Sequence, residues 1–340
     1  MIAQGVDVSE LIIDATAVPV NIKFPQDTHL LNQSHLDLEK MIDDLCKQLT
    51  VKPPRTYKRT AQKEWNNFSR HLKQQRKHRR TIIQHQLQYI KRDLRYVKEL
   101  RAQSGQLTDW QTQRLETIQK VYEQQSYMFE HQIHQVADRI VSLDQPFIRP
   151  IKRGKAKQPT EFGAEIDLSM TSGILELKRF DFNNFHESMD LEAAVDHHWD
   201  LYGQYPTRVL VDKIYRTRAN RAYCEARDIE IPGSKPGRPP KHPDPAKKKA
   251  MIEAENRRGA IERRISYLKF QSWLSLVKAK RIESIAVTVD FAIVSANLDL
   301  LLAFFGVPIL IGVRDGPKTI TILYRMMDSQ AKLAGYPTSH

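Results

Sequence analysis

Three carboxylate residues stand in contexts that could together form a divalent-metal site. Asp14 ends the apolar run Leu11-Ile12-Ile13, and Asp212 ends a second apolar run, Val209-Leu210-Val211. Glu262 lies among basic residues on a segment with helical character. Mg²⁺ takes one or two carboxylates plus substrate phosphate oxygens, and paired ions clamp both oxygens of an in-line phosphoryl transfer. The set therefore predicts metal-dependent chemistry beside phosphate.

Taken alone, each carboxylate also has an ordinary structural interpretation. Asp14 could cap a turn, because Asp is common before a Pro-containing loop. Asp212 could be the N-cap of the next helix, and Glu262 could be an exposed member of an Arg/Glu helical pattern. Only the three residues in this order favour the metal site.

The positive charge of the chain is concentrated in one segment. The 340 residues carry a formal net charge of +13, and residues 52–101 hold 16 Lys or Arg against three acids. Neutralised phosphates release counterions and supply sequence-independent affinity, so this segment predicts contact with nucleic acid. The alternative is a solvated charged coil.

The composition of the chain bears on the cellular compartment in which the protein works. The two cysteines, Cys46 and Cys224, stand far apart without metal-ligand spacing, so neither a disulfide framework nor a zinc site is indicated. No secretory signal pattern opens the chain. The charge-free run Leu300–Val313 is short of a membrane span, and we expect a buried helix followed by a core strand. These features predict a cytoplasmic protein without a membrane partner.

The order of expected elements is that of a mixed α/β chain with a helical insertion. A strand covers residues 9–24, and helical patterns run from about residue 35 to 141. The stretch 60–102 lacks Pro and Gly, which predicts one long helix, and a second helix over 108–140 would return antiparallel to it. Alternation over 161–170 and 174–180 around Thr171-Ser172-Gly173 predicts a β-hairpin. A helix over 191–202 and the Asp212 strand follow.

Several motifs resemble the DDE transposases of bacterial insertion sequences, and specifically the insertion sequence 5 family. The resemblance covers about residues 9–300. It is carried by Asp14-Ala-Thr-Ala-Val-Pro, by the run from Val209 to Cys224, by Pro236-Gly-Arg-Pro-Pro-Lys, and by Arg258-x3-Glu262-x6-Lys269. It implies an α/β fold with a ribonuclease H-like mixed sheet and a long basic helical-hairpin insertion after the first strand.

The resemblance also implies a function: metal-dependent DNA strand cleavage and transfer at insertion-sequence ends. Asp14, Asp212 and Glu262 would be the catalytic residues and the ligands of Mg²⁺, with Mn²⁺ as a substitute. The expected partners are double-stranded DNA and transposon ends, with a homodimer when the protein is complete, in the nucleoid-associated cytoplasm. The expected DNA contacts are Arg258, Lys269, Arg216, Tyr215, Arg263, Arg264, Lys235 and Arg238.

The chain departs from the family pattern at several points. Glu255 replaces the Tyr expected three residues before Arg258, and Ile214 stands where the family usually has Gly. The family's helical N-terminal domain is expected to be missing, since the first strand starts within a few residues of Met1. The alternative hypothesis is therefore a catalytically inactive, truncated transposase that acts only as a DNA-binding protein.

These considerations divide the chain into five parts. The expected parts are residues 1–34 as the first core strand, 35–145 as the inserted basic helical hairpin, 146–231 as the continued core, 232–249 as a basic Pro-rich loop, and 250–340 as the Glu-bearing helix with the C-terminal core elements.

Overall fold

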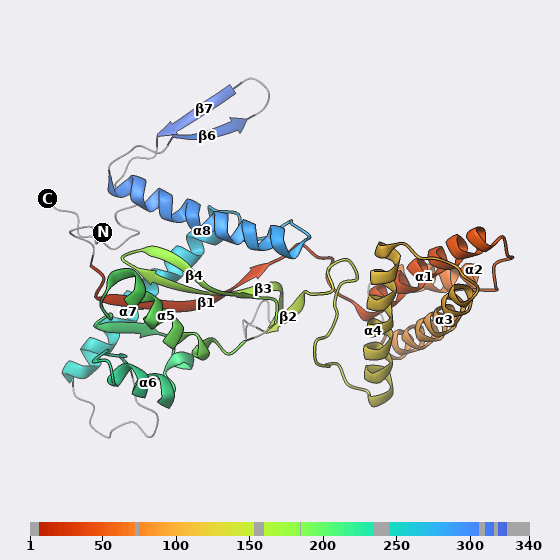
Figure 1. Ribbon diagram of the computed structural model, residues 1–340, viewed down its shortest axis with the longest axis horizontal. Coiled ribbons are helices and arrows are strands. Elements are labelled where there is room, and N and C mark those ends of the chain that lie inside the picture. The colour runs from red at the N-terminus through yellow and green to blue at the C-terminus, as the bar shows by residue number, and fades with distance from the viewer. Residues whose placement is uncertain are drawn as a thin grey trace. The chain divides into compact units, whose positions relative to one another are not determined.

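The computed structural model describes residues 7–71, 75–152, 160–183, 185–233, 245–305, 310–315 and 319–324 (Figure 1). The chain forms two compact units. The first, which we call the sheet unit, comprises Met1–Asn21 and Gly163–His340, and the second, the helical unit, comprises Ile22–Phe162. The helical unit is thus an insertion between the first strand and the rest of the sheet unit.

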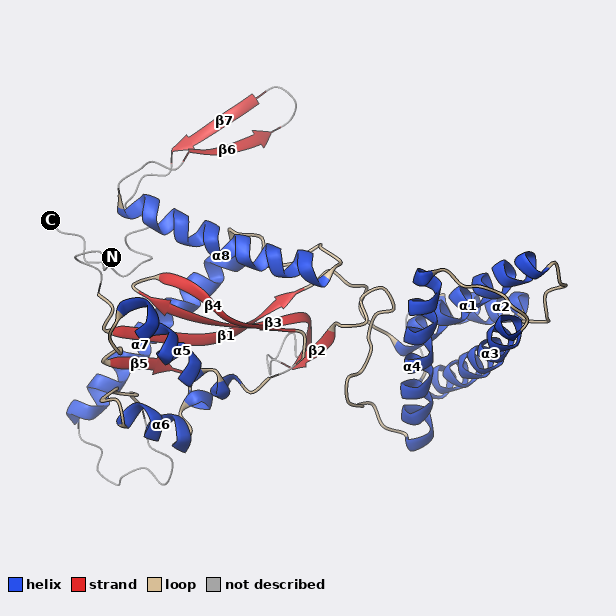
Figure 2. Ribbon diagram, in the orientation of Figure 1, coloured by secondary structure: helices blue, strands red, loops and turns tan. Residues whose placement is uncertain are grey.

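A five-stranded mixed sheet contains strands of the sheet unit together with β2, which falls within the range Ile22–Phe162 (Figure 2). Its order is β2-β3-β1-β5, and β4 also pairs with β3. β1 pairs antiparallel with β3 and parallel with β5, so it is a central strand. The strands are β1 (Glu10–Pro19), β2 (Arg149–Lys152), β3 (Thr160–Thr171), β4 (Ile174–Asp181) and β5 (Arg208–Val211). The mixed α/β class expected from the sequence is confirmed.

Helices cover the strands of this sheet. α5 (Leu191–Tyr202) contacts β1, α7 (Pro245–Phe270) contacts β1 and β5, and α8 (Ile282–Phe304) contacts β4. α6 (Arg218–Glu225) packs on α5, and two short 3₁₀ turns, η1 (Glu187–Met189) and η2 (Lys213–Tyr215), contact each other. A central strand that is buried on both faces has a nearly continuous apolar sequence, which explains the composition of β1.

The expected hairpin between residues 161 and 180 is confirmed. β3 and β4 pair antiparallel with Thr171 opposite Ile174, so Ser172 and Gly173 form a two-residue turn. Both turn residues have positive φ, 51° and 84°, as the favoured two-residue hairpin turns require. The hairpin places β3 beside β1, where its residues reach the centre of the sheet.

The described part of the helical unit contains the helices α1 (Asp27–Leu49), α2 (Lys58–Ser69), α3 (Arg76–Ala102) and α4 (Asp109–His131). α1, α3 and α4 share one apolar core, to which they contribute fully buried side chains such as Leu38, Ile42, Ile90 and Ile118. α2 packs against α3. Thr108 and Gln111 form a reciprocal capping box that starts α4.

The single helix expected over 60–102 is wrong, because two helices, α2 and α3, occupy this stretch. Phe68 is buried and its ring makes an edge contact with His78 at 5.4 Å. In a continuous helix these residues would be roughly 15 Å apart along the axis. Packing of Phe68 therefore outweighs the high helix propensity of the segment.

The second expected helix, over 108–140, is also shorter than predicted. α4 ends at His131, and Gln132 adopts a left-handed conformation that caps it. The chain then turns back, and the Ile140 amide donates to the Gln124 side chain at 3.0 Å. This turn buries Ile140 in the helical core, which a straight helix could not do.

The apolar segment near the C-terminus does not form the expected buried helix and core strand. Leu300 belongs to the last turn of α8, and β6 (Leu310–Asp315) pairs with β7 (Thr319–Tyr324) in a separate two-stranded sheet. Among the described residues, α8 is the one helix whose length and composition would allow it to cross a membrane. Only 28% of its most apolar window is buried.

Buried ion pairs tie the helices of the helical unit together. Arg114 on α4 donates to Asp37 on α1 at 2.6 Å and to Asp144 at 2.9 Å. His35 on α1 contacts Asp93 on α3 at 2.7 Å, with both side chains buried. Removing one partner of a buried pair leaves an uncompensated charge, which is more costly than losing an exposed pair.

We predict that Arg114→Ala destabilises the protein by roughly 3–5 kcal/mol, because the Asp37 charge would stay buried without an opposite charge and would keep only the neutral hydrogen bond from Gln33. The matched control is Arg95→Ala, which removes an exposed pair with Glu99 at 3.5 Å and should cost less than about 1 kcal/mol. Urea denaturation followed by circular dichroism measures both. Equal losses in the two variants would contradict the prediction.

Candidate active site

The parallel pairing of β1 and β5 brings two of the three predicted carboxylates together. The register places Glu10 opposite Arg208 and Ile13 opposite Val211, where β5 ends. The residue that follows each of these two positions is an aspartate: Asp14 on β1 and Asp212 directly after β5. Asp212 is the N-cap of η2, because its side chain accepts a hydrogen bond from the Lys213 amide. The N-cap alternative from the sequence and a place beside Asp14 therefore both apply to this residue.

The third carboxylate reaches this place from α7. Arg258 is one helical turn before Glu262 and donates to it at 2.9 Å. The same guanidinium lies 3.8 Å from the carboxylate of Asp14. Arg258 therefore bridges Asp14 and Glu262, and its own side chain is largely buried while that of Glu262 is exposed.

The pKa of Asp14 reflects its burial and the charges around it. Burial raises the pKa of Asp14 from its ordinary 3.8 to about 6. The positive charge of Arg258 opposes this shift, and the negative charges of Glu262 and Asp212 add to it. All three carboxylates therefore interact electrostatically in one region, as expected for groups gathered at one site.

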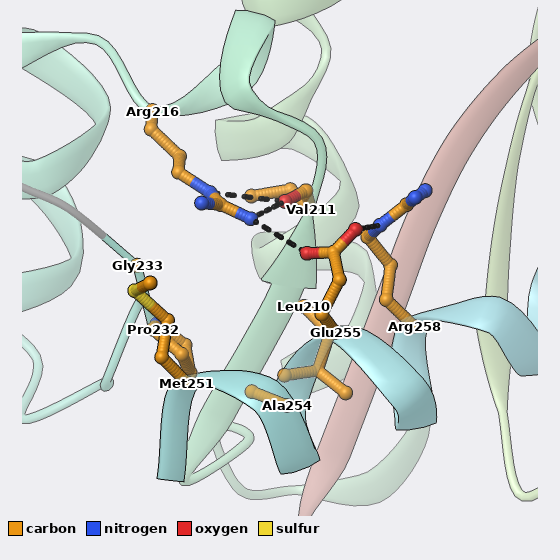
Figure 3. A pocket seen from close by; sticks show the side chains of 9 residues that line it. All are labelled: Leu210, Val211, Arg216, Pro232, Gly233, Met251, Ala254, Glu255 and Arg258. Carbon is orange, nitrogen blue, oxygen red and sulfur yellow. Dashed lines mark hydrogen bonds and ion pairs between the residues drawn. The ribbon is translucent and has the colours of Figure 1, made fainter. Parts of the chain in front are cut away.

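Glu255, a departure from the family pattern, extends the network to a second arginine (Figure 3). Its carboxylate accepts from Arg258 at 2.7 Å and from Arg216 at 3.3 Å. Arg216 also donates twice to the Val211 carbonyl, at 3.1 and 2.7 Å, just before Asp212. Glu255 thus links α7 to the end of β5 through two guanidinium groups.

Gly233 completes the wall of the small pocket beside this network (Figure 3). It has a φ of 123°, and a Cβ added there would lie 2.1 Å from the Arg216 guanidinium. A side chain at this position would displace Arg216 and would also strain the backbone. The glycine therefore lets Arg216 reach the Val211 carbonyl.

No assembled metal cluster is present in the part of the chain that the structure describes, since no three His, Cys, Asp or Glu side chains come close enough to hold an ion. Arg258 supplies the positive charge between Asp14 and Glu262 instead. The predicted carboxylates are therefore neighbours that are bridged by an arginine rather than a preformed three-carboxylate cage.

A buried pair beneath the site was missed by sequence reasoning. Tyr215, in η2 just after Asp212, is fully buried and donates to Asp167 on β3 at 2.9 Å. Asp167 is also fully buried, and its second oxygen has no hydrogen-bond partner among the described residues. The pair fastens the turn that carries Asp212 to the neighbouring strand β3.

The alternating strand pattern over residues 161–170 contained an indication that Asp167 is special. Asp167 is opposite Ala15 in the register, so it is next to Asp14 along the same strand pair. An acid at a central position of a strand buried on both faces indicates a partner, but the partner Tyr215 is 48 residues away. Tyr215 was expected to contact DNA, and its burial does not fit that role.

The other residues that were predicted to contact DNA differ in their exposure and in their contacts. Arg263 is exposed on α7, whereas Arg264 donates to the Ala296 carbonyl on α8 at 2.9 Å and lies over Tyr267. Lys269 is half-buried at the end of α7. The expected contacts Lys235 and Arg238, with most of the basic Pro-rich loop, lie outside the described residues.

The comparison with protein families gives one match. A family model described as "Transposase DDE domain" matches residues 209–298, a range that contains Asp212, Glu262 and most of α8. The match supports a DDE transposase family, and thereby DNA as the substrate class. Asp14 and the helical unit lie outside the matched range. Comparisons with curated proteins and with solved structures found no match.

We predict that Asp167 makes the stability of the protein depend on pH. Burial raises the pKa of Asp167 from its ordinary 3.8 to about 8, partly opposed by the Tyr215 hydrogen bond, while Asp190 and Glu187 add to the rise. The folded state thus holds a proton that the unfolded state releases. Its stabilising effect is complete below about pH 4 and is lost as the pH rises toward 8, by at most ~1.4 kcal/mol per pH unit.

The variant Asp167→Asn keeps an oxygen that accepts from Tyr215 and removes the titration. Relative to the wild type, its unfolding midpoint should therefore rise progressively between about pH 4 and pH 8. Thermal unfolding in a buffer series measures this difference, with the exposed Asp200→Asn as control. A difference between wild type and Asp167→Asn that stays constant with pH would rule out a raised pKa.

Proposed function

We propose that the chain is the catalytic core of a DDE-type transposase that performs metal-dependent DNA strand cleavage and transfer at insertion-sequence ends. The observation that carries the proposal is the β1–β5 register, which sets Asp14 beside Asp212. Glu262 joins them through Arg258. The family match, which contains Asp212 and Glu262, supports the same class.

We interpret the sheet as ribonuclease H-like. An antiparallel hairpin, β3 and β4, lies on one side of the central strand β1, and the parallel strand β5 lies on the other. The aspartates stand on β1 and after β5, and the glutamate stands on the following long helix α7. The helical unit would then be an insertion after the first strand, as the resemblance to the insertion sequence 5 family implies.

The residues present suit a divalent ion of the Mg²⁺ type in their chemistry. All three side chains offer carboxylate oxygens, and Mg²⁺ needs only one or two of these when substrate phosphate completes its shell. Asp14 and Asp212 would be the first ligands, because the register of β1 and β5 sets them side by side. When bound, the ion would stabilise the attacking and leaving oxygens of phosphoryl transfer.

Arg258 would act as the exchangeable partner of the carboxylates. Its guanidinium donates to Glu262 at 2.9 Å and lies 3.8 Å from the carboxylate of Asp14. Glu262 would be a further ligand when a divalent ion is bound. Arg258 could then turn toward a DNA phosphate, for which a planar guanidinium is well suited.

The helical unit would supply the contact with the DNA backbone. In the segment 52–101, every described Lys and Arg except Arg92 is exposed. Arg92 instead stacks on Tyr57 and Tyr89. A predominantly positive exposed surface of this kind favours sequence-independent phosphate binding. With this affinity for DNA, the location that we propose for the protein is the nucleoid in the cytoplasm.

We predict that Asp212→Asn abolishes metal-dependent nicking of supercoiled plasmid by the full chain. The wild type should nick DNA with Mg²⁺ or Mn²⁺ and not with EDTA. Loss of a metal ligand should lower the rate at least ~100-fold, since metal ions contribute several kcal/mol to the transition state. Gel electrophoresis of the plasmid over time measures the rate.

The control for this experiment is Asp228→Asn. Asp228 is exposed and has a φ of 54°, a conformation that Asn tolerates. This variant should nick at the wild-type rate. Wild-type protein that binds DNA but never nicks it would instead support the binding-only alternative, and equal nicking by Asp212→Asn would refute the proposed site.

We predict that the triple variant Arg76→Gln, Lys77→Gln and Arg79→Gln binds duplex DNA with a weaker salt dependence. Each lost phosphate contact should reduce the slope of log affinity against log salt concentration by about one. Fluorescence anisotropy of a labelled duplex between low and moderate salt measures the slope. Lys120→Gln, an exposed change on α4, is the control, and an unchanged slope in the triple variant would exclude this surface.

A further inference from the structure

Helix α8 has two apolar faces that point in opposite directions. One face is buried in the sheet unit and consists of Ile285, Val289, Ala292, Ile293 and Ala296. The other, which we call the outer stripe, consists of exposed residues: Val287, Phe291, Val294, Leu298, Leu301 and Phe305. At 100° per residue the outer stripe is centred about 180° from the buried face.

The outer stripe has the spacing of a helix–helix contact. Its residues follow one another at intervals of 4, 3, 4, 3 and 4 residues, the alternation that keeps an apolar seam against a partner helix. They are 43% to 72% exposed. Together they expose roughly 600 Å², and contiguous apolar patches of this size mark interaction sites.

The inner face holds α8 in place. Asn297 donates to the Leu175 carbonyl at 2.7 Å and accepts from the Leu175 amide at 2.9 Å. Tyr267 donates to Asp299 at 2.5 Å, and Arg264 donates to the Ala296 carbonyl at 2.9 Å. These contacts with β4 and α7 hold the inner face of the helix against the sheet unit.

The borders of the outer stripe disfavour a lipid surface. Helices that lie on membranes carry Lys and Arg on their polar borders. Here one border has the acids Glu283 and Asp290, and the other has Thr288 and Ser295. A protein surface of the same shape suits such borders better than anionic lipid.

We propose that the outer stripe of α8 is the interface between two copies of this chain, paired antiparallel about a two-fold axis near Val294 and Leu298. The resemblance to transposases predicts a homodimer without saying which surface forms it, and this inference does not depend on the proposed catalysis. A two-fold contact uses the same patch on both copies, which a single self-complementary stripe provides. The roughly 600 Å² per copy, with its polar borders, approaches the ~800 Å² of a standard interface.

The antiparallel direction follows from charge. The exposed cations Lys278 and Arg281 stand at the start of α8. In a parallel pair these cations would face their counterparts. In an antiparallel pair they approach the carbonyl end of the partner helix, where positive charge is stabilised.

Sedimentation velocity of the full chain tests the interface. The wild type should sediment as a dimer at micromolar concentration, and Phe291→Asp should dissociate it, with a dissociation constant raised roughly 30-fold or more for a central aromatic anchor. Trp110→Asp changes an equally exposed aromatic on α4 and should leave the dimer intact. Circular dichroism and thermal unfolding establish that each variant is folded.

A cross-linking experiment tests whether the outer stripe forms the contact and does not depend on a disruptive variant. Val294→Cys should be joined to its counterpart by a short bis-maleimide, whereas Trp110→Cys should not, and the buried Cys46 and Cys224 do not compete. A monomeric wild type, or a dimer that Phe291→Asp leaves unchanged, would overturn the proposal. Flotation of a monomeric wild type with anionic vesicles would overturn it in favour of a membrane surface.

Discussion

The parallel pairing of β1 with β5 is the constraint on which the rest of the sheet unit depends. With Ile13 opposite Val211, the two apolar runs share one register and each is followed by an aspartate. A shift by one residue would turn every side chain of β1 to the other face of the sheet. Both the apolar core and the grouping of Asp14 with Asp212 would then be lost together, so stability and site geometry rest on the same hydrogen bonds.

The site shows how neighbouring negative charges are held together by guanidinium groups. Burial, with a smaller contribution from the charges of Glu262 and Asp212, raises the pKa of Asp14, and the positive charge of Arg258 opposes this rise. Glu255 joins Arg258 to a second guanidinium, that of Arg216. Below the site, Asp167 and Tyr215 place a buried polar contact where a sheet would ordinarily have apolar packing. Such arrangements are typical of functional sites rather than of structural cores.

Local sequence patterns predicted the elements of the sheet unit better than those of the helical unit. The hairpin around Ser172, the helix α5 and the strand before Asp212 followed from alternation and turn residues. The division of residues 60–102 did not, because it depends on a contact between Phe68 and His78 that propensity does not register. The Asp167–Tyr215 contact was missed for the same reason, since it joins residues far apart in the chain. The apolar runs that end in Asp14 and Asp212, and the basic segment around Glu262, indicated the three carboxylates, and the family resemblance supported them, while the bridging role of Arg258 was visible only in the structure.

The position of the helical unit in the chain determines the order in which the protein can fold during synthesis. β1 leaves the ribosome before the helical unit, and its partners β3 and β5 begin only at Thr160 and Arg208. The intervening helices have local contacts and can form while β1 is still without a partner. An apolar strand exposed for that time is open to association with other chains. Early folding of the helical unit shortens the distance that β1 must search, so the insertion serves the nascent chain as well as the finished molecule.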